Sequence, residues 1–190
     1  MNKGLPEIIL ASESPRRKEI LSRLGFRFNS ITPSFKEIHD CLPPSLVPVI
    51  NACGKAESVA DMHPSSIVIG ADTIIEFEEE ILGKPGTIPD AKKMLLRLSS
   101  RKHSVVTGVC MMRIKDRGRC VFCDSTEVVF KKLTESAVDD YLSKVNPLDK
   151  AGSYALQEHG DIIIEEVDGS VDNVIGFPSE KFLKAIRLWI

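Results

Sequence analysis

The residue whose type and position most strongly suggest chemistry is Asp72, which lies inside the apolar run 67–75. An ionised carboxylate in such a run costs several kcal/mol unless a cation, a metal or a hydrogen-bond donor pairs with it. Gly70 and Ala71 leave space close to the backbone beside it. Asp72 can therefore serve as a general base, as a Mg²⁺ ligand, or as both. The structural alternative is an aspartate at a strand end that accepts hydrogen bonds from backbone amides.

A second chemical signal is the basic segment 12–18, where Ser14 and Pro15 predict the start of a helix. A helix N-terminus carries partial positive charge and free N–H groups, so acidic side chains normally occupy its first turn. This turn holds three basic residues instead, Arg16, Arg17 and Lys18. An external anion would relieve the conflict, and phosphate best suits a strand, a short loop and a helix N-terminus. The alternative is a set of solvated bases on an exposed turn.

Three further charged residues gain meaning only as a group. Lys84 lies between Gly83 and Pro85, which predict a turn that holds the lysine outward. Lys55 points away from the apolar stripe of its expected helix, and Glu37 lies in a polar loop. Each of these three charges, taken alone, is most often a solvated surface charge.

The segment 149–157 combines a glycine, an aromatic ring and an amide group. The Tyr154 ring could stack on a nucleobase, and the Gln157 amide could read the edge of the base. The alternative is a buried tyrosine with a capping loop around it, because tyrosine fills protein cores well.

Hydrophobic periodicity and capping residues predict the elements that must position these side chains. We expect helices that begin near residues 14, 46, 88, 134 and 180, and strands over 8–11, 67–77, 104–114, 121–130, 161–167 and 173–176. The elements alternate without a strict βαβ rhythm, which favours an α/β fold with a mixed sheet over a regular doubly wound one. The length suits one domain over residues 1–190, with room for two lobes.

Composition excludes several classes of protein. Hydrophobic residues make up 43% of the chain and charged residues 27%, which excludes disorder, collagen and coiled coil. The net charge of −2 argues against a nucleic-acid partner. No apolar run reaches the roughly 18 residues of a membrane span, and the first residues make a poor signal peptide. We therefore expect a cytoplasmic protein with no membrane partner.

The cysteines and histidines do not form a recognisable metal site or disulfide framework. The five cysteines are odd in number and scattered, and the CxxC of Cys120 and Cys123 has no second pair to complete a zinc site. We expect them to be packing residues. The four histidines are unclustered, and the chain contains no Walker A, HExxH or GxSxG motif.

Taken in order, five segments resemble the Maf family of nucleoside triphosphate pyrophosphatases, once described as septum-formation inhibitors. They are ASESPRR at 11–17, GADT at 70–73, ILGKP at 81–85, PLDKAGSY at 147–154 and NVIGFP at 173–178. The resemblance covers nearly the whole chain, from about residue 10 to residue 178. Any one of these motifs is weak evidence, whereas five in the same order are specific.

The resemblance implies a mixed twisted sheet flanked by helices, with two lobes around a nucleotide cleft, as in Maf and ITPase-like proteins. It implies hydrolysis between the α and β phosphates, which yields a nucleoside monophosphate and pyrophosphate with Mg²⁺, or Mn²⁺ as an alternative metal. The Gly-Ser-Tyr-x-x-Gln pattern at 152–157 looks like the branch that prefers dTTP and UTP, with modified pyrimidine nucleotides as further candidates. The resemblance also suggests a homodimer.

Site roles follow from the same resemblance. Asp72 is the implied proton acceptor and Glu37 a second active-site carboxylate, and the two are candidate metal ligands. The implied triphosphate contacts are Ser12, Ser14, Arg16, Lys55 and Lys84. The positions linked to substrate choice are Arg17, Thr73 and Gln157. Two places depart from the family pattern, Glu158-His159 after the glutamine and Cys53-Gly54 before Lys55.

Two other functions remain open at this point. A non-catalytic nucleotide-sensing regulator of cell division would need the same phosphate cradle, but only an enzyme needs Asp72. A generic phosphatase is disfavoured because the chain shows no phosphatase nucleophile motif.

Overall fold

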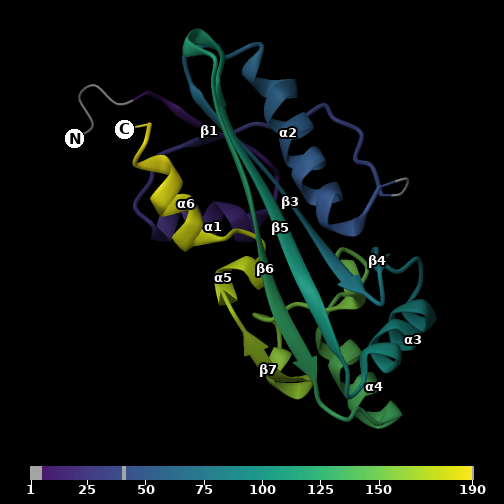
Figure 1. Ribbon diagram of the computed structural model, residues 1–190. Helices are drawn as coiled ribbons and strands as arrows, with labels where there is room; N and C mark the ends of the chain where they lie inside the picture. The colour runs from purple at the N-terminus through teal and green to yellow at the C-terminus, as the bar shows by residue number, and fades with distance from the viewer. Residues whose placement is uncertain (1–5, 40–41, 190) are drawn as a thin grey trace. The chain divides into compact units, whose positions relative to one another are not determined.

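The computed structural model describes residues 6–39 and 42–189, so Cys41 lies outside the described part of the chain (Figure 1). The chain divides into two compact units. Unit 1 comprises residues 1–73, 107–124 and 176–190, and unit 2 comprises residues 74–106 and 125–175. Three long strands contribute residues to both units: β3 (Ile67–Phe77), β5 (Lys102–Arg113) and β6 (Gly118–Phe130).

The remaining elements belong to one unit each. Those of unit 1 are β1 (Ile8–Ala11), α1 (Pro15–Arg23), β2 (Asn29–Ser30), η1 (Pro44–Leu46), α2 (Val47–Ala60), η2 (Ile114–Asp116) and α6 (Ser179–Ile186). Those of unit 2 are β4 (Glu80–Leu82), α3 (Ile88–Leu98), α4 (Glu135–Lys144), η3 (Ala151–Ser153), η4 (Gly160–Ile162), β7 (Ile164–Asp168) and α5 (Val171–Ile175).

The strands form one mixed seven-stranded sheet in the order β2-β1-β3-β5-β6-β7, with β4 paired to β3. β1 is parallel to both β2 and β3, whereas β4 is antiparallel to β3 and β7 is antiparallel to β6. The expected α/β class with a mixed sheet is therefore confirmed. Among the described residues, no helix combines the length and the apolar character that crossing a membrane requires.

In unit 1, helix α2 lies against the sheet at two glycines. A Cβ atom on Gly70 of β3 would come within 2.1 Å of the Ala52 carbonyl oxygen, and one on Gly108 of β5 within 2.4 Å of the Pro48 carbonyl oxygen. Any larger residue would push the helix away. The space that the sequence suggested beside Gly70 is thus filled by the backbone of α2, which corrects the expectation of room for a ligand there.

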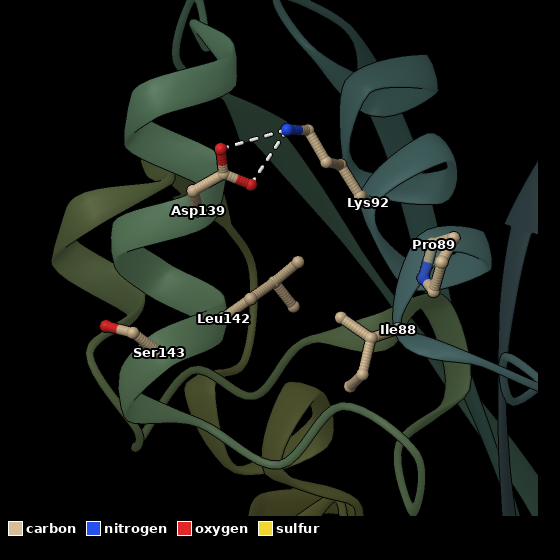
Figure 2. Close-up of a pocket in the computed structure, with 6 residues that line it drawn as sticks. All are labelled: Ile88, Pro89, Lys92, Asp139, Leu142 and Ser143. Atoms are coloured by element: carbon tan, nitrogen blue, oxygen red, sulfur yellow. Dashed lines mark hydrogen bonds and ion pairs between the residues drawn. The ribbon is translucent and has the colours of Figure 1, made fainter.

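In unit 2, helices α3 and α4 begin at the expected caps. The hydroxyl groups of Thr87 and Thr134 accept hydrogen bonds from the backbone N–H groups of Asp90 and Ala137. Figure 2 shows Lys92 of α3 reaching across to Asp139 of α4, where its ammonium donates a hydrogen bond of 2.9 Å to the carboxylate. The two helices cover an apolar core that includes Leu95, Leu98, Val128, Phe130, Val138 and Tyr141.

The C-terminal part of unit 2 differs from the sequence prediction. Residues 173–176 do not form a strand, because residues 171–175 form the short helix α5, where the backbone N–H of Asn173 donates to the Ser170 hydroxyl. The predicted strand over 161–167 begins at Ile164, after η4. Local composition favours strand here, whereas the buried Asn173 amide donates to Val105 O and Thr126 Oγ1, which are tertiary partners.

The cysteines are free wherever the structure describes them. Cys110 is buried and packs as expected, and Cys53 and Cys120 are partly buried. Cys123 is exposed, so the expectation of a packing role is wrong there. Alternate residues of a strand face opposite sides, so on β6 the two CxxC cysteines, three residues apart, point to opposite faces.

Candidate active site

Asp72 lies in the middle of β3 and is buried, with 7% of its surface exposed. Its Oδ1 atom accepts a hydrogen bond of 2.7 Å from Lys55 Nζ, and its Oδ2 atom accepts one of 2.9 Å from Asn51 Nδ2. Both donors come from α2. The partners of the buried carboxylate are thus side chains, and the alternative of a strand-end aspartate bonded to backbone amides is wrong.

Lys55 joins two carboxylates. Its ammonium group lies 2.7 Å from Asp72 Oδ1 and 2.6 Å from Glu37 Oε1. Only 8% of the Lys55 side chain is exposed, against 40% for Glu37. The expectation of a solvated surface charge is wrong for Lys55, because the two carboxylates compensate the charge that burial would otherwise penalise.

The loop that carries Glu37 is fixed to α2 at two points. The Phe35 ring packs over Gly54, where a Cβ atom would lie 2.1 Å from the ring. Asn51 Oδ1 accepts a hydrogen bond from the Ile38 N–H, and Asn51 Nδ2 donates to the Ile38 carbonyl. Glycine at position 54 therefore makes room for the aromatic ring that holds the Glu37 loop.

The N-terminus of α1 follows β1 through a short connection, as the phosphate-cradle prediction requires. Ser14 is the N-cap, and its hydroxyl accepts from the Arg17 backbone N–H at 3.5 Å. The Ser12 hydroxyl accepts from the Ser14 N–H at 3.2 Å. The first turn contains no acidic side chain. The Arg16 side chain makes no hydrogen bond or ion pair with the residues that the structure describes, so it is available to an anion.

The Arg17 guanidinium binds within the protein. It donates to Ser12 Oγ at 3.2 Å, to Thr73 Oγ1 at 3.1 Å and to the Gly176 carbonyl at 3.0 Å. Thr73 Oγ1 also lies 2.9 Å from the hydroxyl of Thr107 on β5. Burial lowers the pKa of Arg17, and the nearby Asp72 carboxylate opposes that shift. Arg17 thus connects the loop before α1, strand β3 and the segment before α6.

Unit 2 holds the other predicted site residues. Lys84 and Gln157 are both exposed. Tyr154 is buried instead, with its hydroxyl 2.7 Å from His103 Nε2 and its ring edge-to-face with Phe130. The expectation that this ring stacks on a base is therefore wrong, and the buried-tyrosine alternative is confirmed. The substrate contacts of Lys84 and Gln157 stay predictions.

Unit 2 also has a surface pocket that does not contain the predicted site residues. Figure 2 shows it between α3 and α4, where it is lined by Ile88, Pro89, Lys92, Asp139, Leu142 and Ser143. None of the predicted site residues lines this pocket.

A family model for Maf-like proteins matches residues 7–189. The chain belongs to the Maf family. Three relatives carry the name dTTP/UTP pyrophosphatase. The protein of Akkermansia muciniphila is 43% identical to this Maf chain over 184 residues, which cover 96% of each chain. That of Geobacillus sp. strain WCH70 is 37% identical over 96% of this chain and 98% of its own. That of a Bacillus cereus strain is 40% identical over 97% of this chain and 91% of its own.

Three groups that the sequence did not indicate form hydrogen bonds with the predicted site residues of this Maf chain. They are the Asn51 amide, the Thr107 hydroxyl and the Gly176 carbonyl. A signal existed for Asn51, because it lies four residues before Lys55 and so shares its helix face. Nothing local distinguishes Thr107 among the β-branched residues of its strand, or the carbonyl of Gly176 from any other.

The donor set of this Maf site suits a hard divalent cation. Mg²⁺ in proteins is usually bound by one or two carboxylates together with substrate phosphates and water. Glu37 and Asp72 supply two carboxylates that already share one cationic partner, the Lys55 ammonium. Across residues 6–39 and 42–189, no group of three or more His, Cys, Asp and Glu side chains is arranged for a metal.

Proposed function

We propose that this protein is a nucleoside triphosphate pyrophosphatase that hydrolyses the bond between the α and β phosphates of dTTP and UTP. The products are a nucleoside monophosphate and pyrophosphate. The observation that carries the proposal is the name that relatives about 40% identical share over nearly their full length, dTTP/UTP pyrophosphatase. The buried carboxylate of Asp72, held by Lys55 and Asn51, supports it independently.

Asp72 would position the attacking water and accept its proton. A carboxylate offers about four acceptor sites, and Asp72 uses one on each oxygen for Lys55 and Asn51. Acceptor capacity therefore remains on both oxygens for a water molecule. Because two side chains from α2 fix the carboxylate, its orientation is set before substrate arrives, which is how a general base contributes to rate.

The cations and helix N-terminus would neutralise the triphosphate. The proposed phosphate contacts are Ser12, Ser14, Arg16, Lys55 and Lys84. Mg²⁺, or Mn²⁺ in its place, would be held by Asp72 and Glu37, and it would withdraw charge from the phosphate oxygens so that water can approach the phosphorus. The open Arg16 guanidinium is suited to bidentate binding of phosphate oxygens.

Substrate choice is proposed to involve Arg17, Thr73 and Gln157. Arg17 and Thr73 would act by holding the loop before α1 and strand β3 in place, since both are bonded within the protein. Gln157, which is exposed, would contact the base. We further propose that residues 1–190 act as one Maf-like domain in the cytoplasm, as a homodimer, with no nucleic-acid or membrane partner.

The direct test incubates the purified protein with dTTP and UTP in ¹⁸O-water with Mg²⁺. We expect equal amounts of monophosphate and pyrophosphate, with the ¹⁸O label in the monophosphate because water attacks the α phosphorus. Purine triphosphates, CTP and 7-methyl-GTP serve as matched substrates and should turn over more slowly. Removing the metal with EDTA should abolish turnover, and adding Mg²⁺ or Mn²⁺ should restore it.

Two results would reject the proposal. Release of orthophosphate as the first product would place the cleavage at the wrong bond. Saturable binding of dTTP without any product would favour the nucleotide-sensing regulator instead.

A further inference from the structure

A pair of cysteines in unit 1 takes no part in the proposed chemistry. Cys53 lies on α2 and packs against the apolar cluster that contains Cys110 of β5. Cys110 is fully buried, whereas Cys53 is partly exposed. Both pack in the apolar cluster that contains Ala52 and Ala56. One thiol of the pair is thus accessible to a small reagent, and the other is buried in the same cluster.

The backbone holds these two elements unusually close. Gly108 lies two residues before Cys110 and therefore on the same face of β5. A Cβ atom on Gly108 would come within 2.6 Å of the Val49 nitrogen, so the α2 backbone touches the strand there. The close approach places the segments of α2 and β5 that carry the two cysteines next to one another.

The surroundings of the pair shift the pKa values of its two thiols in opposite directions. The hydrogen bond from Cys110 lowers the pKa of Cys53 to about 7, and the Arg119 guanidinium adds to this effect while burial and Glu57 oppose it. The same hydrogen bond and burial raise the pKa of Cys110. Arg119 and Glu57 are themselves ion-paired beside Cys53. Cys53 is thus the more acidic thiol of the pair, and it is also the one that a reagent can reach.

We propose that Cys53 and Cys110 form an oxidation site, at which hydrogen peroxide converts the two thiols into an intramolecular disulfide. The Cys53 thiolate attacks one peroxide oxygen, the O–O bond breaks, and the hydroxide that leaves takes up a proton to become water. The sulfenic acid on Cys53 is then attacked by the Cys110 sulfur, which releases the second water and closes the S–S bond. The two sulfurs together lose two electrons, and the peroxide gains them.

The disulfide would act on the Asp72 site through α2, an effect that rests on the proposed function. Asn51 and Lys55, which hold Asp72, lie two residues to either side of Cys53. Closing the bond draws the two sulfurs to about 2.05 Å, which shifts α2 relative to β5. We expect kcat to fall on the order of tenfold or more, since a displacement of about 1 Å can cost about 100-fold.

The test treats the full-length protein with hydrogen peroxide and measures the intact mass and the disulfide-linked peptides. We expect a loss of two hydrogen atoms, a Cys53–Cys110 linked peptide, and full reversal by dithiothreitol. Cys53→Ser and Cys110→Ser should each abolish the linked peptide. The matched control is the double variant Cys120→Ser/Cys123→Ser, which removes two of the other three cysteines and should leave the linked peptide unchanged.

Three results would overturn the inference. The first is a disulfide that joins other cysteines. The second is a Cys53 that stops at the sulfenic acid or proceeds to the sulfinic acid while Cys110 stays reduced. The third is a Cys53 that hydrogen peroxide oxidises no faster than it oxidises Cys123. Peptide mapping of the wild-type protein decides among these even if a serine variant fails to fold. If the reduced protein does not hydrolyse dTTP, the proposed function fails, but the mapped disulfide still supports or rejects the oxidation site.

Discussion

Asp72 in unit 1 and Tyr154 in unit 2 are both buried polar side chains, yet their surroundings differ in kind. Asp72 is held by an ammonium and an amide from α2, and a second carboxylate shares the ammonium. Tyr154 meets His103 through one hydrogen bond, and its ring lies edge-to-face with Phe130 in an apolar cluster. The first arrangement retains acceptor capacity for a ligand, whereas the second is satisfied within the core. Burial of a polar group alone does not indicate a site, because its remaining bonding capacity decides what it can do.

The largest expected effect comes from removing the cation that compensates Asp72. Lys55→Met leaves the Asp72 carboxylate buried without its ion-pair partner, and breaking such a buried pair costs about 3–5 kcal/mol in the free energy of unfolding. Urea unfolding monitored by circular dichroism measures this loss. Adding Asp72→Asn to Lys55→Met should restore part of the stability, because the uncompensated charge is gone. A double variant no more stable than Lys55→Met would contradict the ion-pair account.

The second largest effect is expected when low pH destabilises the Tyr154 region. Burial lowers the pKa of His103 to about 4, so between its ordinary value near 6.5 and pH 4 only the unfolded chain takes up the proton. The free energy of unfolding should therefore be highest above pH 6.5 and fall by roughly 3 kcal/mol in total as the pH drops to about 4. Measuring urea unfolding at several pH values tests this. His103→Gln should flatten the profile, and the exposed His159→Gln should leave it unchanged.

A third experiment separates catalysis from stability in the Asp72 region. Asp72→Asn keeps the size of the side chain and should lower kcat for dTTP by at least about 100-fold, the lower end of general-base effects. Binding of dTTP should stay largely intact, since the proposed phosphate contacts remain. The matched control on the same strand is Glu76→Gln, which should retain kcat. Equal activity of Asp72→Asn and the wild type would remove Asp72 from the role of base.

The smallest effect is expected at an exposed ion pair outside both regions. Lys92 of α3 binds Glu135 and Asp139 of α4. Figure 2 shows its contact with Asp139. Because water and salt screen these charges, Lys92→Met should change the free energy of unfolding far less than Lys55→Met does. Parallel urea titrations of the two variants make the comparison. A comparable loss in both would mean that charge burial does not distinguish the two lysines.

The candidate site could be predicted in part. Asp72 was recognisable because a charged residue in an apolar run needs a partner, and the helix start at Ser14 because its basic first turn breaks a local rule. The burial of Lys55 was not recognisable, since its partners Asp72 and Glu37 lie 17 residues after it and 18 before it. Likewise, two of the three partners of Arg17, Thr73 and Gly176, come from segments that only folding brings to it.

The sequence by itself determined the longer helices and strands, though not the short helix α5, and with them the mixed α/β class. Caps such as Thr87 and Thr134, and the hydrophobic period of each segment, act within a turn or two of the chain, so they can be read locally. The tertiary structure alone decided which polar groups are satisfied, as at Tyr154, at Asn173 and around Asp72. Those partnerships depend on burial and on contacts between distant segments. The physical reason is that the energy of a buried polar group is set by its neighbours in space.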